Sequence, residues 1–365
     1  MTVFDFAIAG AGIAGASLAA ELAQGGATVL LLEAEDQPGY HSTGRSAAFW
    51  DECYGGPDVV PLTLASGPYL REHGFLRQRG ALYIGREDEG AQIDSFLARY
   101  CDTGASIERV GASQIRKAVR GVREDWSHGV WEPACADIDV AGLHAHYLAR
   151  ARAGGVALKC RAHLVGAVRA ADTWTLTLED GRSFKAAMLV NAAGAWADEV
   201  ATFAGAKPLR LKAFSRTVVQ ARTDPAPPPD MPLVLDISGR FYFKPEAGRL
   251  WLSPHDEVPS LPQDVAPEEL SVAEAIDRFE QVVDWRIERV EKRWAGLRTF
   301  APDRLPVYGP DPRLVAFVWF AGQGGFGIQT APAAARLLSQ RLLAKQPDAM
   351  TRSLDQTRYD PARLG

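Results

Sequence analysis

The stretch AIAGAGIAG, residues 7–15, constrains the fold more than any other part of the sequence. It sets Gly10, Gly12 and Gly15 between an apolar run (Val3–Ala9) typical of a buried strand and a helical run (Ile13–Gln24). We expect Gly10 to permit the turn, Gly12 to let the backbone approach a phosphate, and Gly15 to let helix and strand touch. The helix N-terminus then offers free N–H groups to an anion. The pattern predicts the beginning of a dinucleotide-binding fold.

A second strand supports this interpretation. Thr28–Leu32 is apolar and β-branched, and Glu33 follows it about 20 residues after the glycines. A carboxylate at this position can accept hydrogen bonds from both ribose hydroxyls, and it disfavours a 2′-phosphate. A nicotinamide dinucleotide that exchanges and a flavin that stays bound both fit the motif.

Composition excludes several classes of protein. The chain has 365 residues, of which 47% are hydrophobic, so two lobes with a large core are expected. The formal charge of -5 gives no signature of nucleic-acid binding. The four cysteines stand far apart without a CxxC pair, so we expect a reducing compartment and no metal site. No basic leader and no apolar run of about 18 residues is present, which favours a soluble, cytoplasmic protein without a transmembrane segment.

Two later segments repeat the order of strand, small-residue turn and helix. The first has a strand at Met188–Val190, a turn of small residues ending at Gly194, and a helix through Trp196. The second has a strand at Val315–Phe320, a glycine-rich turn at 322–327 and a helix at about 329–343. Ligands of doubly wound sheets bind at the carboxyl ends of strands. We therefore expect the three turns to meet at one elongated cofactor.

The region between the last two turns has a different pattern. Residues 233–253 predict antiparallel strands with turns at 238–239 and 246–248, flanked by the strands SRTVVQ and RIERVEKRWAGLRTF. Tyr242 alternates with Phe241 and Phe243, so either the tyrosine or the phenylalanines face the core. Residues 271–283 form an amphipathic helix that can cover the sheet. The proline-rich segment 224–232 predicts a stiff loop.

Five blocks of sequence carry a family resemblance. They are the glycine motif with its helix and second strand, GYHSTGRSAA (39–48), NAAGAWADEVA (191–201), WAGLRTFAPDRLPVYG (294–309) and GQGGFGIQTAPAAA (322–335). Together they resemble the FAD-dependent D-amino-acid oxidase and glycine oxidase superfamily. The 39–48 block and DIDVAGLHAHYL (137–148) are most similar to bacterial D-amino-acid dehydrogenases of the D-arginine dehydrogenase type. The resemblance implies FAD, bound without a covalent bond because no Cys or His lies in a recognisable attachment stretch.

The fold class expected is α/β, or α+β overall. A discontinuous Rossmann-like FAD-binding domain would take residues 1–48, 140–206 and 298–365, and a mainly antiparallel substrate-binding domain would take 49–139 and 207–297. Backbone N–H groups at 324–328, with a helix dipole behind them, can stabilise negative charge on a reduced flavin ring. The cofactor contacts expected are Gly10, Gly12, Ile13, Ala14, Gly15, Glu33, Ser42, Thr43, Gly44, Arg45, Ser46, Val165, Ala193, Gly194, Trp196, Gly324, Gly325, Phe326, Gly327, Ile328 and Gln329.

The resemblance also implies a clamp for a substrate carboxylate. Arg298 and Tyr242 match the family's carboxylate binders, Tyr54 matches a tyrosine over the pocket, and Arg216 matches a second pocket arginine. A guanidinium group binds a carboxylate through two parallel hydrogen bonds, and a phenol adds direction. Flavin N5 would then accept a hydride from the substrate α-carbon. His41, His144 and His146 are expected to be structural, and Phe49 stands where the dehydrogenase relatives tend to have a histidine.

The expected reaction is oxidative deamination of a D-amino acid, with an unidentified electron acceptor that is a quinone, a carrier or oxygen. By the same resemblance, Gly80 and Ala81 stand where D-arginine-selective relatives have an acid that pairs the guanidinium of the substrate. We therefore expect a substrate with a neutral or apolar side chain. If Arg77 or Arg79 pointed inward, an acidic side chain would be favoured instead. Two alternatives stay open: oxidation of a secondary amine (glycine or sarcosine type) or a 2-hydroxy acid, and a non-catalytic FAD subunit of a larger complex.

Overall fold

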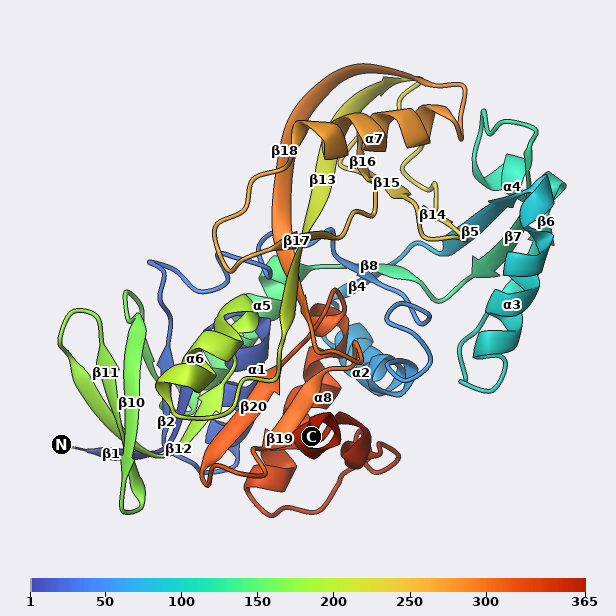
Figure 1. Cartoon of the computed structure of the whole chain (residues 1–365). Coiled ribbons are helices and arrows are strands. Elements are labelled where there is room, and N and C mark those ends of the chain that lie inside the picture. Colours follow the sequence, from blue (N-terminus) through green and yellow to red (C-terminus); the bar gives the residue numbers. More distant parts are fainter. Residues whose placement is uncertain (1) are drawn as a thin grey trace.

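β1 (Val3–Ala9) lies inside an eight-stranded sheet in the computed structural model, which describes residues 2–365. β1 is parallel to β12 on one side and to β2 on the other, and β20 adds in parallel to the carboxyl end of β12 (Figure 1). The strands of this first sheet are β1, β2 (Val29–Leu32), β9 (Ala157–Lys159), β10 (Leu164–Ala170), β11 (Thr173–Leu178), β12 (Ser183–Asn191), β19 (Val307–Pro310) and β20 (Phe317–Ala321).

Helices cover both faces of the first sheet because its strands are apolar on both faces. The cluster on one face joins Ile8 and Leu31 to α1 (Ile13–Gln24), α5 (Val140–Ala153) and α8 (Gly327–Leu342). The cluster on the other face joins Trp174 and Trp319 to α6 (Ala197–Phe203). The opening strand, turn, helix and second strand therefore lie as the sequence predicts. After the middle turn, however, a short 3₁₀ turn, η2 (Gly194–Trp196), precedes the helix.

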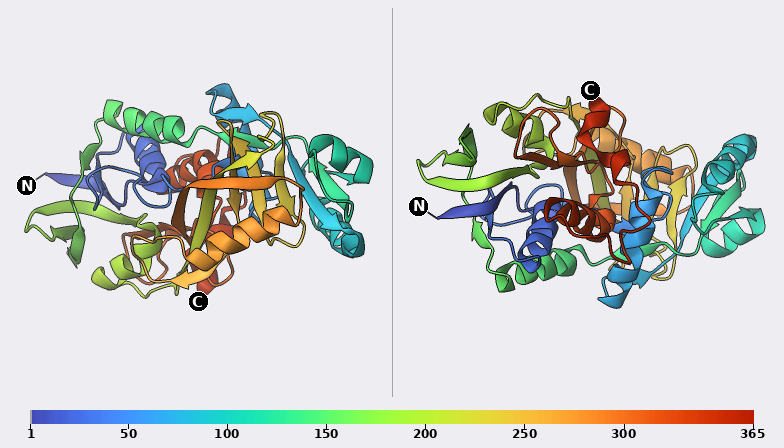
Figure 2. Two further views of the ribbon diagram at one scale, coloured as in Figure 1. Left: turned by 90° about the horizontal axis from the view of Figure 1, so that it is seen from above. Right: turned by 90° about the horizontal axis from the view of Figure 1, so that it is seen from below.

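A nine-stranded sheet forms the other half of the molecule (Figure 2). Its order is β17-β13-β16-β15-β14-β5-β7-β6, and β18 pairs with β13 along nearly its whole length. The strands are β5 (Ala81–Arg86), β6 (Glu108–Gly111), β7 (Trp126–Glu132), β13 (Lys212–Asp224), β14 (Leu233–Asp236), β15 (Tyr242–Glu246), β16 (Arg249–Ser253), β17 (Val258–Ser260) and β18 (Arg286–Phe300). The proline-rich loop lies between β13 and β14, as expected.

The amphipathic helix of this half is α7 (Glu269–Glu280), which packs on β13, β16 and β18 and so covers one face of the sheet. Phe241 and Phe243 lie in the cluster beneath α7 with Phe279. Tyr242 lies on the opposite face, in a cluster with Phe49 and Tyr54. The structure thus decides between the two orientations: the phenylalanines face the helix, and the tyrosine faces the first half of the molecule.

The remaining elements connect or flank the two sheets. β3 (Phe49–Trp50), β8 (Ala136–Ile138) and β4 (Leu76–Gln78) form a small antiparallel sheet. The other helices and 3₁₀ turns are α2 (Val60–Glu72), η1 (Glu87–Glu89), α3 (Gly90–Tyr100), α4 (Ala112–Ala118), η3 (Gln356–Tyr359) and η4 (Pro361–Leu364). β18 runs through the expected domain boundary at residue 298. Among residues 2–365, no helix combines the length and the apolarity that crossing a membrane requires.

Candidate functional site

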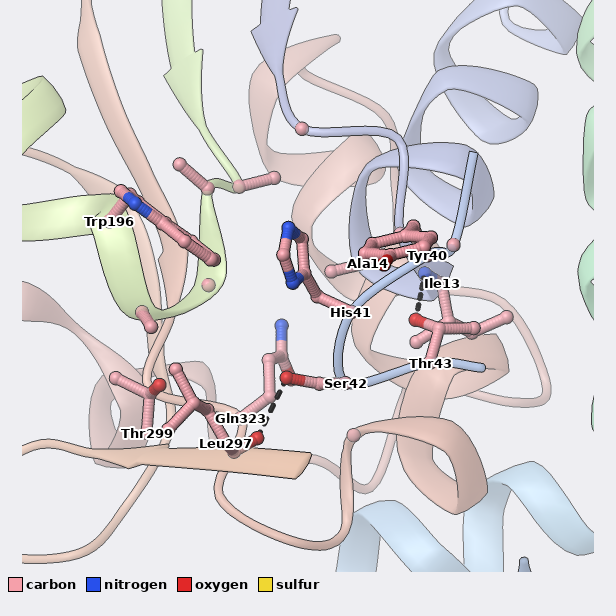
Figure 3. Close-up of a pocket in the computed structure, with 18 of the residues that line it drawn as sticks. Ile13, Ala14, Tyr40, His41, Ser42, Thr43, Trp196, Leu297, Thr299 and Gln323 are labelled. Atoms are coloured by element: carbon pink, nitrogen blue, oxygen red, sulfur yellow. Dashed lines mark hydrogen bonds between the residues drawn. The ribbon is translucent and has the colours of Figure 1, made fainter. Parts of the chain in front are cut away.

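A cavity of about 430 Å³ lies at the carboxyl ends of β1, β2 and β12, where the three small-residue turns meet. A volume in this range suits a bound small molecule. Figure 3 shows His41 and Trp196 beside this space, with Ser42, Thr43, Leu297 and Gln323 also at its sides. The predicted residues that line it are Gly10, Gly12, Ile13, Ala14, Glu33, Ser42, Thr43, Arg45, Ser46, Ala193, Gly194, Trp196, Arg216, Tyr242, Arg298, Gly324, Gly325, Gly327 and Ile328.

The first turn is close-packed against backbone. Gly10 has a φ of +100°, and a Cβ there would lie 2.6 Å from the carbonyl oxygen of Ala192. A Cβ on Gly15 would lie 1.8 Å from the carbonyl oxygen of Gly10, so helix and strand touch where the sequence predicts. Gly15 itself does not line the cavity, because its contribution is this close approach. Side chains at either glycine would displace backbone, so only glycine fits these two positions of the turn.

The N-terminus of α1 and the end of β2 hold two polar groups at the cavity wall. Ile13 N–H donates to Thr43 Oγ1 at 3.0 Å, as Figure 3 shows. Glu33 accepts from Ala11 N–H at 3.0 Å through Oε2 and from Glu35 N–H at 3.1 Å through Oε1. Burial of the Glu33 carboxyl raises its pKa, and these two N–H groups oppose that rise. The Glu33 carboxyl group is thus held by backbone in the cavity wall at the end of β2.

The 39–46 loop closes one side of the cavity. Ser42 Oγ donates to the carbonyl oxygen of Leu297 at 2.7 Å, which ties the loop to β18. Arg45 pairs with Asp264 at 2.6 Å, so its charge is already neutralised by the protein. His41 bonds Glu35 at 2.8 Å and packs on Trp196, with 4.6 Å between ring centroids. His41 is therefore a hydrogen-bonded loop residue, as expected, although it also lines the cavity.

The C-terminal turn joins the cofactor end of the cavity to the predicted clamp. Gly324 has a φ of +54°, and its N–H donates to the carbonyl oxygen of Thr299 on β18 at 2.8 Å. A Cβ on Gly325 would lie 2.1 Å from the Tyr54 hydroxyl and 2.9 Å from Cζ of Arg298. Tyr54 is not counted among the lining residues, but it reaches the cavity through this contact.

The predicted clamp residues converge at this end of the cavity. The Arg216 side chain is buried, donates from Nε to the carbonyl oxygen of Asp256 at 2.5 Å, and has no partner at Nη1 within residues 2–365. The Tyr242 hydroxyl is also buried and, in the same described range, without a partner. Arg298 lies with Cζ 5.5 Å from the centre of the Tyr54 ring. Burial, with the neighbouring charge of Arg298 added, lowers the pKa of Arg216 to about 10, so it stays charged at neutral pH.

His255 is a neighbour of the clamp that the sequence analysis did not single out. Its ring lies 5.8 Å from that of Tyr242, and its Nδ1 is 2.6 Å from the carbonyl oxygen of Gly239. Burial, followed by the charges of Arg216 and Arg298, lowers the pKa of His255 to about 2. This imidazole is therefore neutral. His255 lies between β16 and β17, and nothing in the sequence around it indicates that it reaches the clamp.

Four further predicted cofactor contacts lie outside the cavity lining. Val165 turns its side chain to solvent with 40% exposure, because it occupies an outward position of β10; the wall there is made by Ala162, His163 and Leu164 instead. Phe326 packs with Phe300 and Val59 in a small core cluster. The Gln329 side chain binds the Asp51 backbone and Thr63, and Gly44 lies on the other side of the 39–46 loop.

The two arginines that could have favoured an acidic substrate side chain, Arg77 and Arg79, do not reach the cavity. Arg77 and Arg79 both bind Asp137, at 2.9 and 2.6 Å, and neither lines the cavity. Ala81 is buried in the cluster that contains Tyr242. Gln323 and Thr299 line the cavity from within the blocks 322–335 and 294–309, although the sequence analysis named neither, whereas His163 and Glu179 line it without a recognisable sequence signal. His163 immediately precedes β10 and Glu179 immediately follows β11, and the antiparallel pairing of these two strands brings both residues together at the cavity.

Comparison with known proteins decides the family. The family model described as FAD dependent oxidoreductase (DAO) matches residues 5–341. The chain belongs to this family. FAD is accordingly its cofactor, and the close glycine turns, the N-terminus of α1 and Glu33 fit a dinucleotide.

Individual relatives are distant. The mitochondrial dimethylglycine dehydrogenase of Homo sapiens is 26% identical over 251 residues, which cover 63% of this chain and 29% of that protein. The chain thus spans less than a third of the length of that relative. The L-proline dehydrogenase of P. horikoshii is 21% identical with a TM-score of 0.86, covering 99% and 98% of the two chains. The glycine oxidase of Geobacillus kaustophilus is 21% identical with a TM-score of 0.85, covering 100% and 99%. Both solved structures share the fold.

Proposed function

We propose that this FAD-dependent oxidoreductase oxidises a D-amino acid with a neutral or apolar side chain. The product is an imino acid, which water hydrolyses to a 2-oxo acid and ammonia. FAD, when bound, supplies the acceptor for the hydride that leaves the substrate α-carbon. The residues of the chain bind the carboxylate, orient the Cα–H bond and exclude water.

One observation carries the proposal: buried donors without partners converge beside the C-terminal glycine turn. Nη1 of Arg216 and the hydroxyl of Tyr242 lack partners within the described chain, and Arg298 lies at the same turn. A buried, unpaired donor costs about 1–3 kcal/mol, and more when it is charged, so this arrangement favours a bound anion. A substrate carboxylate supplies that anion. Arg298 would form the two parallel hydrogen bonds, with Arg216 and Tyr242 completing the clamp.

The surroundings of the clamp favour an uncharged side chain. Phe49 contacts both Tyr54 and Tyr242, with ring centroids 5.6 and 5.5 Å apart. The carboxylates among the lining residues, such as Glu33 and Glu179, belong to the opposite, nucleotide end of the cavity. Asp256 and Glu257 pair with Arg216 but do not line the cavity, so a cationic substrate side chain would enter without a free carboxylate, at a cost of several kcal/mol. Arg77 and Arg79 are bound to Asp137, which leaves no cation from β4 to favour an acidic side chain.

A secondary amine is the second candidate substrate. Dimethylglycine dehydrogenase, L-proline dehydrogenase and glycine oxidase are among the similar proteins, and their names describe N-substituted or side-chain-free amino acids. The same carboxylate clamp would serve such a substrate. A 2-hydroxy acid and a non-catalytic role in a larger complex remain further alternatives.

The predicted cofactor contacts and the two-domain division given above are part of this proposal, with Val165, Phe326, Gln329 and Gly44 acting from outside the cavity wall. So are non-covalent attachment of FAD, a cytoplasmic location, and an acceptor that is a quinone, a carrier or oxygen.

The test is anaerobic mixing of the holoenzyme with a substrate panel while flavin absorbance is recorded. The panel contains D-Phe, D-Leu, D-Met, D-Arg, D-Lys, D-Glu, their mirror images, glycine, sarcosine, L-proline and 2-hydroxy acids. We expect apolar D-amino acids to bleach the flavin fastest. D-Arg ranked first would refute the specificity, sarcosine or proline ranked first would select the second candidate, and no bleaching by any amine would contradict amine oxidation altogether.

A further inference from the structure

The four-residue loop Asp51–Tyr54, which carries Tyr54, is held by two carboxyl groups. Asp51 Oδ1 accepts from Cys53 N–H at 2.8 Å, and Asp51 Oδ2 accepts from the Tyr83 hydroxyl at 2.6 Å. Glu132 Oε1, at the end of β7, accepts from Glu52 N–H at 2.7 Å. Two consecutive N–H groups just before Tyr54 are therefore fixed by these two side chains.

Both carboxyl groups are fully buried. Asp51 and Glu132 have no solvent exposure, and their carboxyl oxygens lie within 4.8 Å of each other. Burial is the largest cause that raises the pKa of each, and for Glu132 the charge of Asp51 raises it further. Two adjacent buried carboxyl groups cannot both ionise, because each charge disfavours the other.

The other groups that face the pair do not neutralise it. They are the Tyr83 hydroxyl, Glu52, and the thiols of Cys53 and Cys135, whose pKa values burial raises. Glu132 Oε2 has no donor to accept from within residues 2–365. A proton on this oxygen gives it a partner, because the proton can be donated to Asp51, and it leaves only one of the two carboxyl groups charged.

The loop is coupled to the clamp through Tyr54. The Tyr54 hydroxyl lies against Gly325, and its ring lies beneath the guanidinium of Arg298. The carbonyl oxygen of Asp51 accepts from Tyr54 N–H at 3.3 Å and from Gln329 Nε2 at 3.0 Å, which joins the loop to the beginning of α8. A shift of this loop therefore moves the phenol and the arginine together.

We propose that Asp51 and Glu132 form a positioning pair, sharing one proton, that fixes Tyr54 and through it Arg298 for carboxylate binding. The proposal rests on the carboxylate clamp of the proposed function. Neither residue lines the cavity, so the pair acts through Tyr54. The shared proton lets the carboxyl groups hold the loop without two buried like charges.

A metal site is the competing explanation for this pair of carboxyl groups, because Cys53 Sγ lies within 4.8 Å of both of them. A divalent cation bound there would require both carboxyl groups to be ionised. Glutamine in place of Glu132 separates the two possibilities. Its amide keeps an acceptor for Glu52 N–H and donates to Asp51 as a protonated acid does, but it is a poor ligand for a metal.

The experiment measures binding of 3-phenylpropionate, a carboxylate without an amine, to the oxidised holoenzyme at pH 7 from the change in flavin absorbance. Glu132→Ala is expected to weaken binding about tenfold or more with the FAD spectrum retained, and Glu132→Gln to restore it to within about threefold of the unmodified protein. Tyr83→Phe, which keeps the ring and removes the donor to Asp51, should weaken binding several-fold and serves if Glu132→Ala does not fold.

Two controls keep the outcomes distinct. Glu89→Gln changes another buried glutamate, whose partners Ser238 and Arg240 do not line the cavity, and should lower Tm without changing the Kd. Arg298→Met should abolish binding; if it does not, Arg298 does not hold the carboxylate, and the clamp on which the positioning pair depends is wrong. If Arg298→Met abolishes binding but Glu132→Ala and Tyr83→Phe leave the Kd unchanged, the positioning pair alone is overturned. The positioning pair is also overturned if Glu132→Gln binds 3-phenylpropionate as weakly as Glu132→Ala does and the substitution removes a stoichiometric metal ion. That result would favour a metal site.

Discussion

Replacement of Gly325 by alanine tests the geometry of the clamp most directly. The backbone at this residue lies outside the left-handed region, so the new methyl group acts only by contact. It would lie 2.1 Å from the Tyr54 hydroxyl, which must move by about 1.3 Å to reach an ordinary 3.4 Å contact. Cζ of Arg298, at 2.9 Å, must move by about 0.5 Å.

These shifts fall on the groups that hold the substrate carboxylate. A displacement of about 1 Å can cost roughly a hundredfold in rate, equivalent to about 2.7 kcal/mol of transition-state stabilisation. We therefore expect kcat/KM of Gly325→Ala for the best amine substrate to fall about a hundredfold, with most of the loss in KM. Retention of FAD should change little, because the nearest atoms belong to Tyr54 and Arg298.

Steady-state kinetics with the reconstituted holoenzyme, together with the flavin spectrum, measure this effect. Gly111→Ala is the matched control, because a Cβ there has no atom within 4 Å and the φ of −108° suits alanine. Its kinetics should equal those of the unmodified protein. If Gly325→Ala retained full kcat/KM with FAD bound, Tyr54 and Arg298 would not form the clamp at this turn.

Four other outcomes are expected. Arg298→Met should lower kcat/KM by about 2–5 kcal/mol with the flavin spectrum intact, because a charged partner of the carboxylate is lost; unaltered kinetics would move the role to Arg216. Glu33→Ala should weaken FAD retention in ultrafiltration while circular dichroism shows that the fold persists. The substitution removes the carboxyl group, oriented by Ala11 N–H, that would accept hydrogen bonds from the ribose hydroxyls of FAD. Acid precipitation should release the yellow colour to the supernatant, whereas colour in the pellet would contradict non-covalent FAD. The value of kcat/KM should also rise with pH through the pKa of the substrate amine, because the hydride leaves when the amine nitrogen can donate its lone pair.

Local patterns were enough to predict much of the fold. The glycine spacing at residues 10–15 predicted the strand, turn, helix and second strand, because each step is dictated by neighbours within a few residues. The later turns and the antiparallel strands were also predicted, although β20 and α8 begin two residues later and two residues earlier than expected. The family resemblance directed attention to Arg298, Arg216 and Tyr242, which the structure brings to one end of the cavity.

Only the tertiary structure decided how distant segments meet. Alternation left the face of Tyr242 open, and packing of α7 on the phenylalanine face settled it. Val165 was expected at the cofactor, but its side chain faces solvent, since the register of β10 determines which neighbours turn inward. Asp51 and Glu132 are read from the sequence as ordinary acids, 81 positions apart. They share a buried site because β7 ends beside the loop that carries Tyr54, and burial and charge repulsion act only between groups that the fold brings into contact.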